Sequence, residues 1–181
     1  NSKLAKDTVT LVEGNESING VSALKLVTDL GNDSKTYGLW SSASAGYLTH
    51  ATGTMVGGAS SMVLTYNSPL LMYPRDVTVG TKHSTAGGYT YTVSGGAPGS
   101  GTLEVEVTVL ARGAVTVAAG TFADCLNFRV VSKNTVGTVV ENRTTTYDYC
   151  RGLGPVRSHT EANDGSGKVD VIDEALVRAV I

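Results

Sequence analysis

The sequence has few charged residues, no basic cluster and no long apolar run. Charged side chains make up 17% of the 181 residues, and the formal net charge is −2. Nucleic-acid binding needs a concentrated basic surface, which no stretch of this sequence supplies, so DNA and RNA are not expected partners. A membrane-spanning helix needs about 18 or more consecutive apolar residues. The apolar stretch at residues 69–73 is far too short, so no transmembrane segment is predicted.

Residues that bind metals or carry out nucleophilic catalysis are sparse and scattered. The three histidines, His50, His83 and His159, stand far apart, and neither H-x-x-x-H nor C-x-x-C spacing occurs. A Gly-x-Ser-x-Gly elbow is also missing. The sequence therefore predicts no catalytic residue, no metal site and no cofactor, and we do not expect an enzyme. A hydrolase whose site is not recognisable from sequence remains an alternative.

What the sequence does contain is alternation with a period of two, separated by turn residues. In the segment 103–109, apolar residues alternate with Glu104, Glu106 and Thr108, which is typical of a strand with one buried face. Similar runs occur at residues 8–12, 21–27, 35–40, 62–66, 89–93, 115–118, 125–131 and 144–149, with turns expected at 13–15 and 57–58. We therefore predict a single all-β domain over residues 1–181, built as one curved antiparallel sheet of about ten strands, a half-barrel or open barrel.

Two parts of the chain leave alternatives open. Residues 169–181 have apolar residues at helical spacing but also fit a last strand, which we favour. The segments that begin at Gly20 and Gly120 both resemble a three-stranded meander, which indicates either a duplicated unit or the chance likeness of turn-rich strands.

The two cysteines predict a specific hairpin. If Cys125 and Cys150 face each other across an antiparallel pair, the hairpin closes with the two-residue loop Gly137-Thr138. Glycine at the first central position is what a type II′ turn requires. The same register places four apolar or aromatic side chains on one face, namely Leu126, Phe128, Tyr147 and Tyr149. The sequence thus predicts the turn, the register and the face together.

In this register the cysteines occupy a non-hydrogen-bonded pair, where Cα atoms approach to about 4.5 Å, within disulfide range. A disulfide persists only in an oxidising compartment, so we predict a periplasmic or secreted protein. Two reduced thiols in a cytoplasmic protein are the alternative. The start at Asn1 rather than Met fits a removed signal peptide, with or without an anchor, and equally fits cloning.

The segment 115–125, with the sequence VTVAAGTFADC, and the segment 151–157, with the sequence RGLGPVR, resemble the "VTVPAGTF…C" strand and "APGVGLVK" hairpin of uncharacterised bacterial exported proteins. Residues 69–80 are similar to the approach "PLLLPLPLKVGDTW" in the same proteins. The resemblance implies a curved sheet of the lipoprotein-carrier-like half-barrel type. The chain departs from the pattern at Ala118, where Pro is common, and at Cys150-Arg151, where Ala-Pro is common.

The candidate binding residues are aromatic and apolar. Tyr89 and Tyr91 point to one face of a strand and could form a platform for a ligand, or pack across strands as core. The stretch Leu70, Leu71, Met72 and Tyr73 could line the mouth of the sheet or cap it. We therefore expect a non-catalytic extracytoplasmic binding or carrier-like module with a concave apolar groove for a hydrophobic small molecule or lipid. A structural or protein-interaction domain of the cell envelope, with another envelope protein as partner, is the alternative.

Overall fold

A computed structural model describes residues 9–30, 33–151, 153–163, 166 and 168–175. Within these ranges the chain forms eleven strands and no helix. The strands are β1 (Val9–Ile18), β2 (Val21–Asp29), β3 (Ser34–Ala43), β4 (Gly46–Val56), β5 (Ala59–Pro74), β6 (Lys82–Val93), β7 (Gly99–Val117), β8 (Gly120–Val136), β9 (Val139–Cys150), β10 (Gly154–Asn163) and β11 (Val169–Ala175).

The strands form one sheet whose order is the order of the chain, from β1 to β11. Consecutive strands joined by short turns pair antiparallel, as a meander requires. Among the described residues β1 pairs only with β2 and β11 only with β10, so the order is open at both ends. The prediction of a single open antiparallel sheet is confirmed, with eleven strands instead of about ten.

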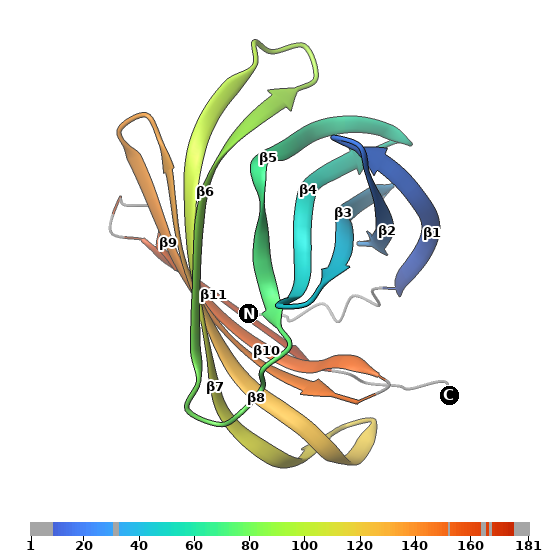
Figure 1. Cartoon of the computed structure of the whole chain (residues 1–181), viewed down its shortest axis with the longest axis vertical. Coiled ribbons are helices and arrows are strands. Elements are labelled where there is room, and N and C mark those ends of the chain that lie inside the picture. Colours follow the sequence, from blue (N-terminus) through green and yellow to red (C-terminus); the bar gives the residue numbers. More distant parts are fainter. Residues whose placement is uncertain (1–8, 31–32, 152, 164–165, 167, 176–181) are drawn as a thin grey trace. The chain divides into compact units, whose positions relative to one another are not determined.

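The chain divides into two compact units. The first contains residues 1–73 and 87–101, and the second contains residues 74–86 and 102–181. The expected single domain over 1–181 stays a prediction. Within each unit the strands are bent along their length, in agreement with the curved sheet expected from the sequence (Figure 1).

Alternation along β2, β3 and β4 gives the first unit two distinct faces. Ala23, Leu39 and Ala51 lie on one face, are at most 5% exposed, and carry Ile18 and Tyr37 packed against them. We call this side the core face. The opposite side, which carries Thr28, Thr36 and Thr54 as cross-strand partners, is called the threonine face. The two faces therefore differ in chemistry, with a small buried apolar cluster on one side and a half-buried row of hydroxyl-bearing side chains on the other.

Strand β7 shows why the sequence pattern predicted two strands where the structure has one. Val105, Val107 and Val109 are at most 3% exposed, as the alternation of 103–109 predicts. The pairing with β8 then shifts between Val109 and Ala111 and again between Gly113 and Val115. These two bulges interrupt the alternation without ending the strand, which joins residues 103–109 and 115–117 into β7. The turn expected at 13–15 is likewise a bulge, because the pairing of β1 with β2 shifts between Val12 and Gly14.

The hairpin of β8 and β9 has the register predicted from the cysteines. Cys125 pairs with Cys150, Val136 pairs with Val139, and no bulge interrupts the ladder between them. Gly137 has a φ of 57°, while Thr138 is not among the residues with positive φ, as a type II′ turn requires. Phe128 packs against Tyr147, with ring centroids 5.3 Å apart. The predicted disulfide, turn and shared face are confirmed.

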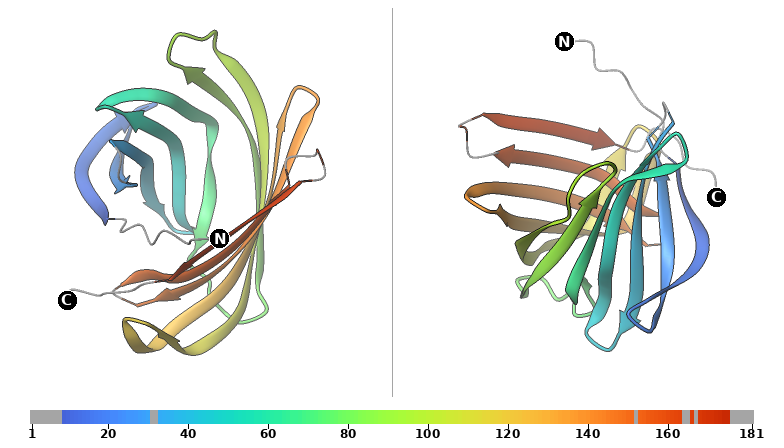
Figure 2. Two further views of the ribbon diagram at one scale, coloured as in Figure 1. Left: turned by 180° about the vertical axis from the view of Figure 1, so that it is seen from behind. Right: turned by 90° about the horizontal axis from the view of Figure 1, so that it is seen from above.

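The two segments with similar sequence fold alike. Strands β2, β3 and β4 form a three-stranded antiparallel meander in the first unit, and β8, β9 and β10 form another in the second (Figures 1 and 2). A duplication behind this likeness stays a prediction. Residues 169–175 form β11, as favoured over a helix, and residues 176–181 lie outside the described part of the chain.

Candidate functional site

Tyr89, one of the two candidate platform residues, is part of a buried aromatic cluster. Its side chain is 2% exposed, and its ring meets that of Tyr66 edge to face at 6.2 Å and that of Tyr91 at 6.3 Å. The phenol of Tyr66 is hydrogen-bonded to Thr52, and burial raises its pKa. Edge-to-face packing of this kind stabilises a core. Neither candidate tyrosine lies among the lining residues of the pocket described below.

The apolar stretch of β5 is divided between core and surface. Leu70 is 1% exposed and packs over Gly87, while Leu71, Met72 and Tyr73 are half-buried. The ring of Tyr73 lies 5.5 Å from that of Trp40, the single tryptophan of the chain. Tyr73 therefore packs against a residue that lines the pocket.

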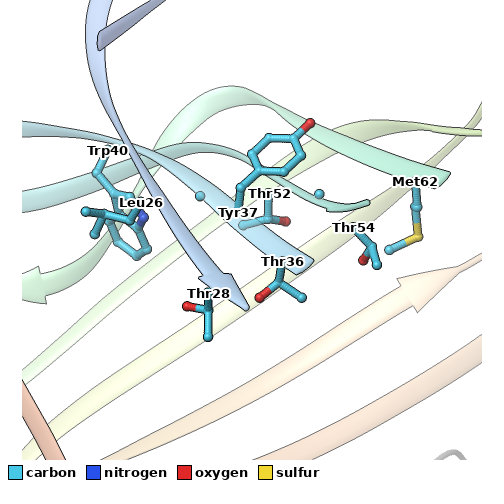
Figure 3. Close-up of a pocket in the computed structure, with 10 residues that line it drawn as sticks. Leu26, Thr28, Thr36, Tyr37, Trp40, Thr52, Thr54 and Met62 are labelled. Atoms are coloured by element: carbon cyan, nitrogen blue, oxygen red, sulfur yellow. The ribbon is translucent and has the colours of Figure 1, made fainter. Parts of the chain in front are cut away.

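A pocket of about 360 Å³ lies within the first unit (Figure 3). This volume is in the range of small-molecule sites, about 300–1,000 Å³. Its apolar side chains are Leu26, Trp40 and Met62, and none of its side chains carries a formal charge. The lining residues are Leu26, Thr28, Thr36, Tyr37, Gly38, Trp40, Thr52, Gly53, Thr54 and Met62. They come from β2, β3, β4 and β5.

Trp40 lies flat on the sheet because Gly38 has no side chain. A Cβ atom at position 38 would collide with Nε1 of the indole. In Figure 3 the side chains of Trp40 and Thr36 extend to one side of the strands, and the ring of Tyr37 extends to the other. Tyr37 in turn covers Gly53 on the core face, where a Cβ atom would collide with the phenol ring. The two glycines thus hold one aromatic ring on each face of the same three strands.

The polar part of the pocket is a row of threonines. Thr28 on β2, Thr36 on β3 and Thr54 on β4 are successive cross-strand partners, so their side chains stand side by side on the threonine face. The hydroxyl of Thr52 is bonded to Tyr66. No hydrogen bond of the Thr36 or Thr54 hydroxyl occurs within the described part of the chain. The pocket therefore combines an indole surface with hydroxyl groups that are available to a ligand.

Sequence reasoning did not find these residues. The signal that could have indicated them was present at residues 36–40, where Trp40 follows Gly38 at a spacing of two on one strand face. Threonine is common in strands, so the row becomes visible only when the register of β2, β3 and β4 is known.

A second unexpected arrangement is the pair Ser41 and His50, on the neighbouring strands β3 and β4. Ser41 Oγ and His50 Nε2 are 2.7 Å apart, and the imidazole is 4% exposed. Burial lowers the pKa of His50, which favours a neutral ring that can accept the serine proton. Within the described ranges no carboxylate bonds to the other ring nitrogen, so the pair lacks the acid that orients histidine in a catalytic triad.

The second unit carries an ion pair whose carboxylate is buried and whose arginine is exposed. Asp148 has a side chain 5% exposed, accepts a hydrogen bond from Arg157 Nε at 2.6 Å, and accepts another from Asn127 Nδ2 at 2.8 Å. His159, on the adjacent strand β10, pairs with Asp173 of β11. No cluster of three or more metal-ligating side chains occurs in the part of the chain that the structure describes. The same residues include no helix long and apolar enough to cross a membrane.

The fold and the pocket together define an open antiparallel β-sheet protein with an uncharged, partly apolar pocket in its first unit. No family model matches the chain, and neither the curated proteins nor the solved structures contain a match. The resemblance to bacterial exported β-proteins therefore stays a prediction.

Proposed function

We propose that the protein is a non-catalytic, extracytoplasmic binding or carrier-like module that takes a hydrophobic small molecule or lipid in the pocket of the first unit. The observation that carries the proposal is the pocket itself: about 360 Å³, with the Trp40 indole, Leu26 and Met62 in its wall and no charged side chain among the lining residues. Pockets that bind small ligands are of this size and are mainly apolar with a few polar groups.

The test uses N-phenyl-1-naphthylamine, a neutral apolar dye whose fluorescence rises on binding, and follows the emission of Trp40 at the same time. We expect saturable binding of one dye per chain. Leu26→Asn replaces an apolar wall with a polar one and should weaken binding by about tenfold or more. The control is Leu11→Asn, because Leu11 is an apolar residue of the same unit that is 61% exposed and does not line the pocket. Non-saturable binding, or equal loss in both variants, would refute the proposal.

The proposed location rests on the disulfide between Cys125 and Cys150, because such bonds are rare in reducing compartments. Protein isolated from its native host with free thiols blocked at lysis should show these cysteines linked in an unreduced digest. Blocked, alkylated cysteines in native material would overturn the location.

A structural or protein-interaction domain is the second candidate, favoured by the two terminal strands of the sheet. Leu11 and Val12 on β1 are 61% and 62% exposed, and Val169, Val171 and Ile172 on β11 are 52–56% exposed. Exposed apolar edge strands are sites where further strands pair. Cross-linking in the native envelope followed by mass spectrometry tests this candidate. Cross-links from β1 or β11 to one recurrent protein would favour it.

A hydrolase is the third candidate, and the pair Ser41 and His50 is what favours it. A fluorophosphonate probe that labels an activated serine distinguishes this candidate, with Ser41→Ala as control. Labelling that disappears in the variant would support a catalytic function.

A further inference from the structure

The lining of the pocket combines apolar side chains with threonine hydroxyl groups, which indicates a more specific class of ligand than any apolar molecule. We propose that its ligand is an uncharged amphiphile with several hydroxyl groups, whose hydroxylated head faces the threonine row and whose apolar part lies against Trp40. This inference rests on the proposed function, and it names the ligand class of the same site.

The first argument is charge. None of the lining side chains carries a formal charge, and the wall includes an indole, a leucine and a methionine. A carboxylate or phosphate placed there would lose hydration and gain no opposite charge. Uncharged ligands do not have that cost, so the pocket selects against fatty acids and phospholipid head groups.

The second argument is the spacing of the hydroxyl groups. Thr28, Thr36 and Thr54 lie on three adjacent strands. Neighbouring strands are about 4.8 Å apart, so their side chains form a row with that repeat. Because the Thr36 and Thr54 hydroxyls have no partner within the described residues, they can both donate to and accept from a ligand. A head group with two or more hydroxyls, such as glycerol or a sugar, can bond to both of them at once.

The third argument is the fixed apolar surface beside this row. The indole of Trp40 packs on the backbone of Gly38, and its ring also contacts the ring of Tyr73. Leu26 pairs with Gly38 across the strands, next to the pair formed by Thr28 and Thr36. The apolar and hydroxyl parts of the pocket are therefore adjacent rows of one surface, which matches a molecule with an apolar part joined directly to a hydroxylated head.

The experiment compares four probes of matched eight-carbon chain: octyl glucoside, 1-monooctanoylglycerol, octanol and octanoate. Binding is measured by the emission of Trp40, which is the only tryptophan and lines the pocket, and by calorimetry. We expect the two polyhydroxylated probes to bind at least about tenfold more tightly than octanoate. Preference for octyl glucoside would identify a sugar head, and preference for 1-monooctanoylglycerol would identify a glycerol head.

Thr36→Val and Thr54→Val remove the hydroxyls and keep the shape and strand preference of the side chain. Each variant should bind octyl glucoside or 1-monooctanoylglycerol about three- to tenfold more weakly, which is the usual effect of losing one neutral hydrogen bond. The naphthylamine dye should bind to both variants somewhat more tightly, because valine makes the pocket more apolar. The matched control is Thr65→Val, because Thr65 pairs with Thr90 on β5 and β6 and does not line the pocket.

The outcomes separate the two proposals. If the dye binds but octanoate binds as well as the polyhydroxylated probes, or if the valine variants bind all probes normally, the inference is wrong and the proposed function stands. If neither the dye nor any probe binds, the proposed function fails as well.

Discussion

Cys125 and Cys150 occupy directly opposite positions on β8 and β9 and are joined by a disulfide, with their Cα atoms 4.0 Å apart. Both residues are 1% exposed and pack with Val156 in the core of the second unit. The disulfide therefore links the two strands of the hairpin within the core. It fills space in the folded protein and restricts the conformations of the unfolded chain.

Replacing both cysteines by alanine should lower the free energy of unfolding substantially. A loop closed over a sequence separation of 25 residues is expected to contribute about 3–4 kcal/mol through the entropy of the unfolded chain. Urea denaturation of the double variant Cys125→Ala, Cys150→Ala against the oxidised protein measures the difference. The protein unfolded in the presence of reductant is the control and should approach the variant. An unchanged midpoint would contradict the prediction.

The register of this hairpin was predictable from sequence because its constraints are local. One pair of cysteines, one glycine at a two-residue turn, and two cross-strand pairs of apolar or aromatic side chains all agree on a single alignment, and no bulge intervenes. Alternation alone was less informative where bulges occur. In β7, shifts after Val109 and after Gly113 reverse which side chains face inward, so one strand had the sequence pattern of two.

The pocket was not predictable from sequence, because no local feature fixes the registers on which it depends. Its threonine row depends on the registers between β2 and β3 and between β3 and β4, and the second contains a shift between Leu39 and Trp40. No cysteine pair fixes either register. The candidate residues chosen from sequence, such as Tyr89 and Leu70, were selected for apolar character, and the structure buries both.

Gly38, which lies under the ring of Trp40, and Gly99, which lies under the ring of Tyr91, offer a matched pair of substitutions. Gly38→Ala should push the Trp40 indole away from the sheet, which should shift its fluorescence emission and weaken dye binding by about tenfold. Gly99→Ala should displace the ring of Tyr91, which does not line the pocket, and leave dye binding within about twofold. Fluorescence titration of both variants, with circular dichroism to verify the fold, checks the prediction. Equal loss of binding in the two variants would show that the position of Trp40 is unimportant.

His159 should make the attachment of β11 depend on pH. Its Nδ1 lies 2.6 Å from Asp173 on β11 and its Nε2 lies 3.4 Å from Glu161 on its own strand, while its partner on β9 is the uncharged Thr146. The hydrogen bond with Asp173, then that with Glu161, raises the pKa of His159 above its ordinary 6.5. The ion pairing of His159 therefore contributes its full stabilisation of the folded protein below pH 6.5. This contribution is lost as the pH rises through the raised pKa that His159 has in the folded state.

Hydrogen exchange of the β11 amides, corrected for the intrinsic pH dependence, measures this effect. Protection should decline as pH rises above 6.5, and the decline should shrink at high salt because the side chains are exposed. His159→Gln, which keeps a hydrogen-bonding side chain but does not titrate, is the control. A decline of the same size in this variant would rule out His159 as its cause.

Two arginine–aspartate pairs of the second unit should differ in their contribution to stability. Arg157 and Arg112 are similarly exposed, at 55% and 60%, but the side chain of Asp148 is 5% exposed and that of Asp124 is 41% exposed. Arg157→Gln would leave a buried carboxylate that keeps the hydrogen bond from Asn127 but loses its cation, which should cost about 2 kcal/mol. Arg112→Gln breaks a solvated pair and should cost less than about 1 kcal/mol.

Urea denaturation of the two glutamine variants measures both effects under one condition. The comparison isolates burial of the carboxylate, because the substitution, the arginine exposure and the type of partner are the same in both pairs. Adding Asp148→Asn to Arg157→Gln should restore part of the lost stability, since an amide does not carry the charge that makes the buried carboxylate costly. Equal destabilisation by the two single variants, or no recovery in the double variant, would mean that Arg157 does not stabilise the buried charge of Asp148.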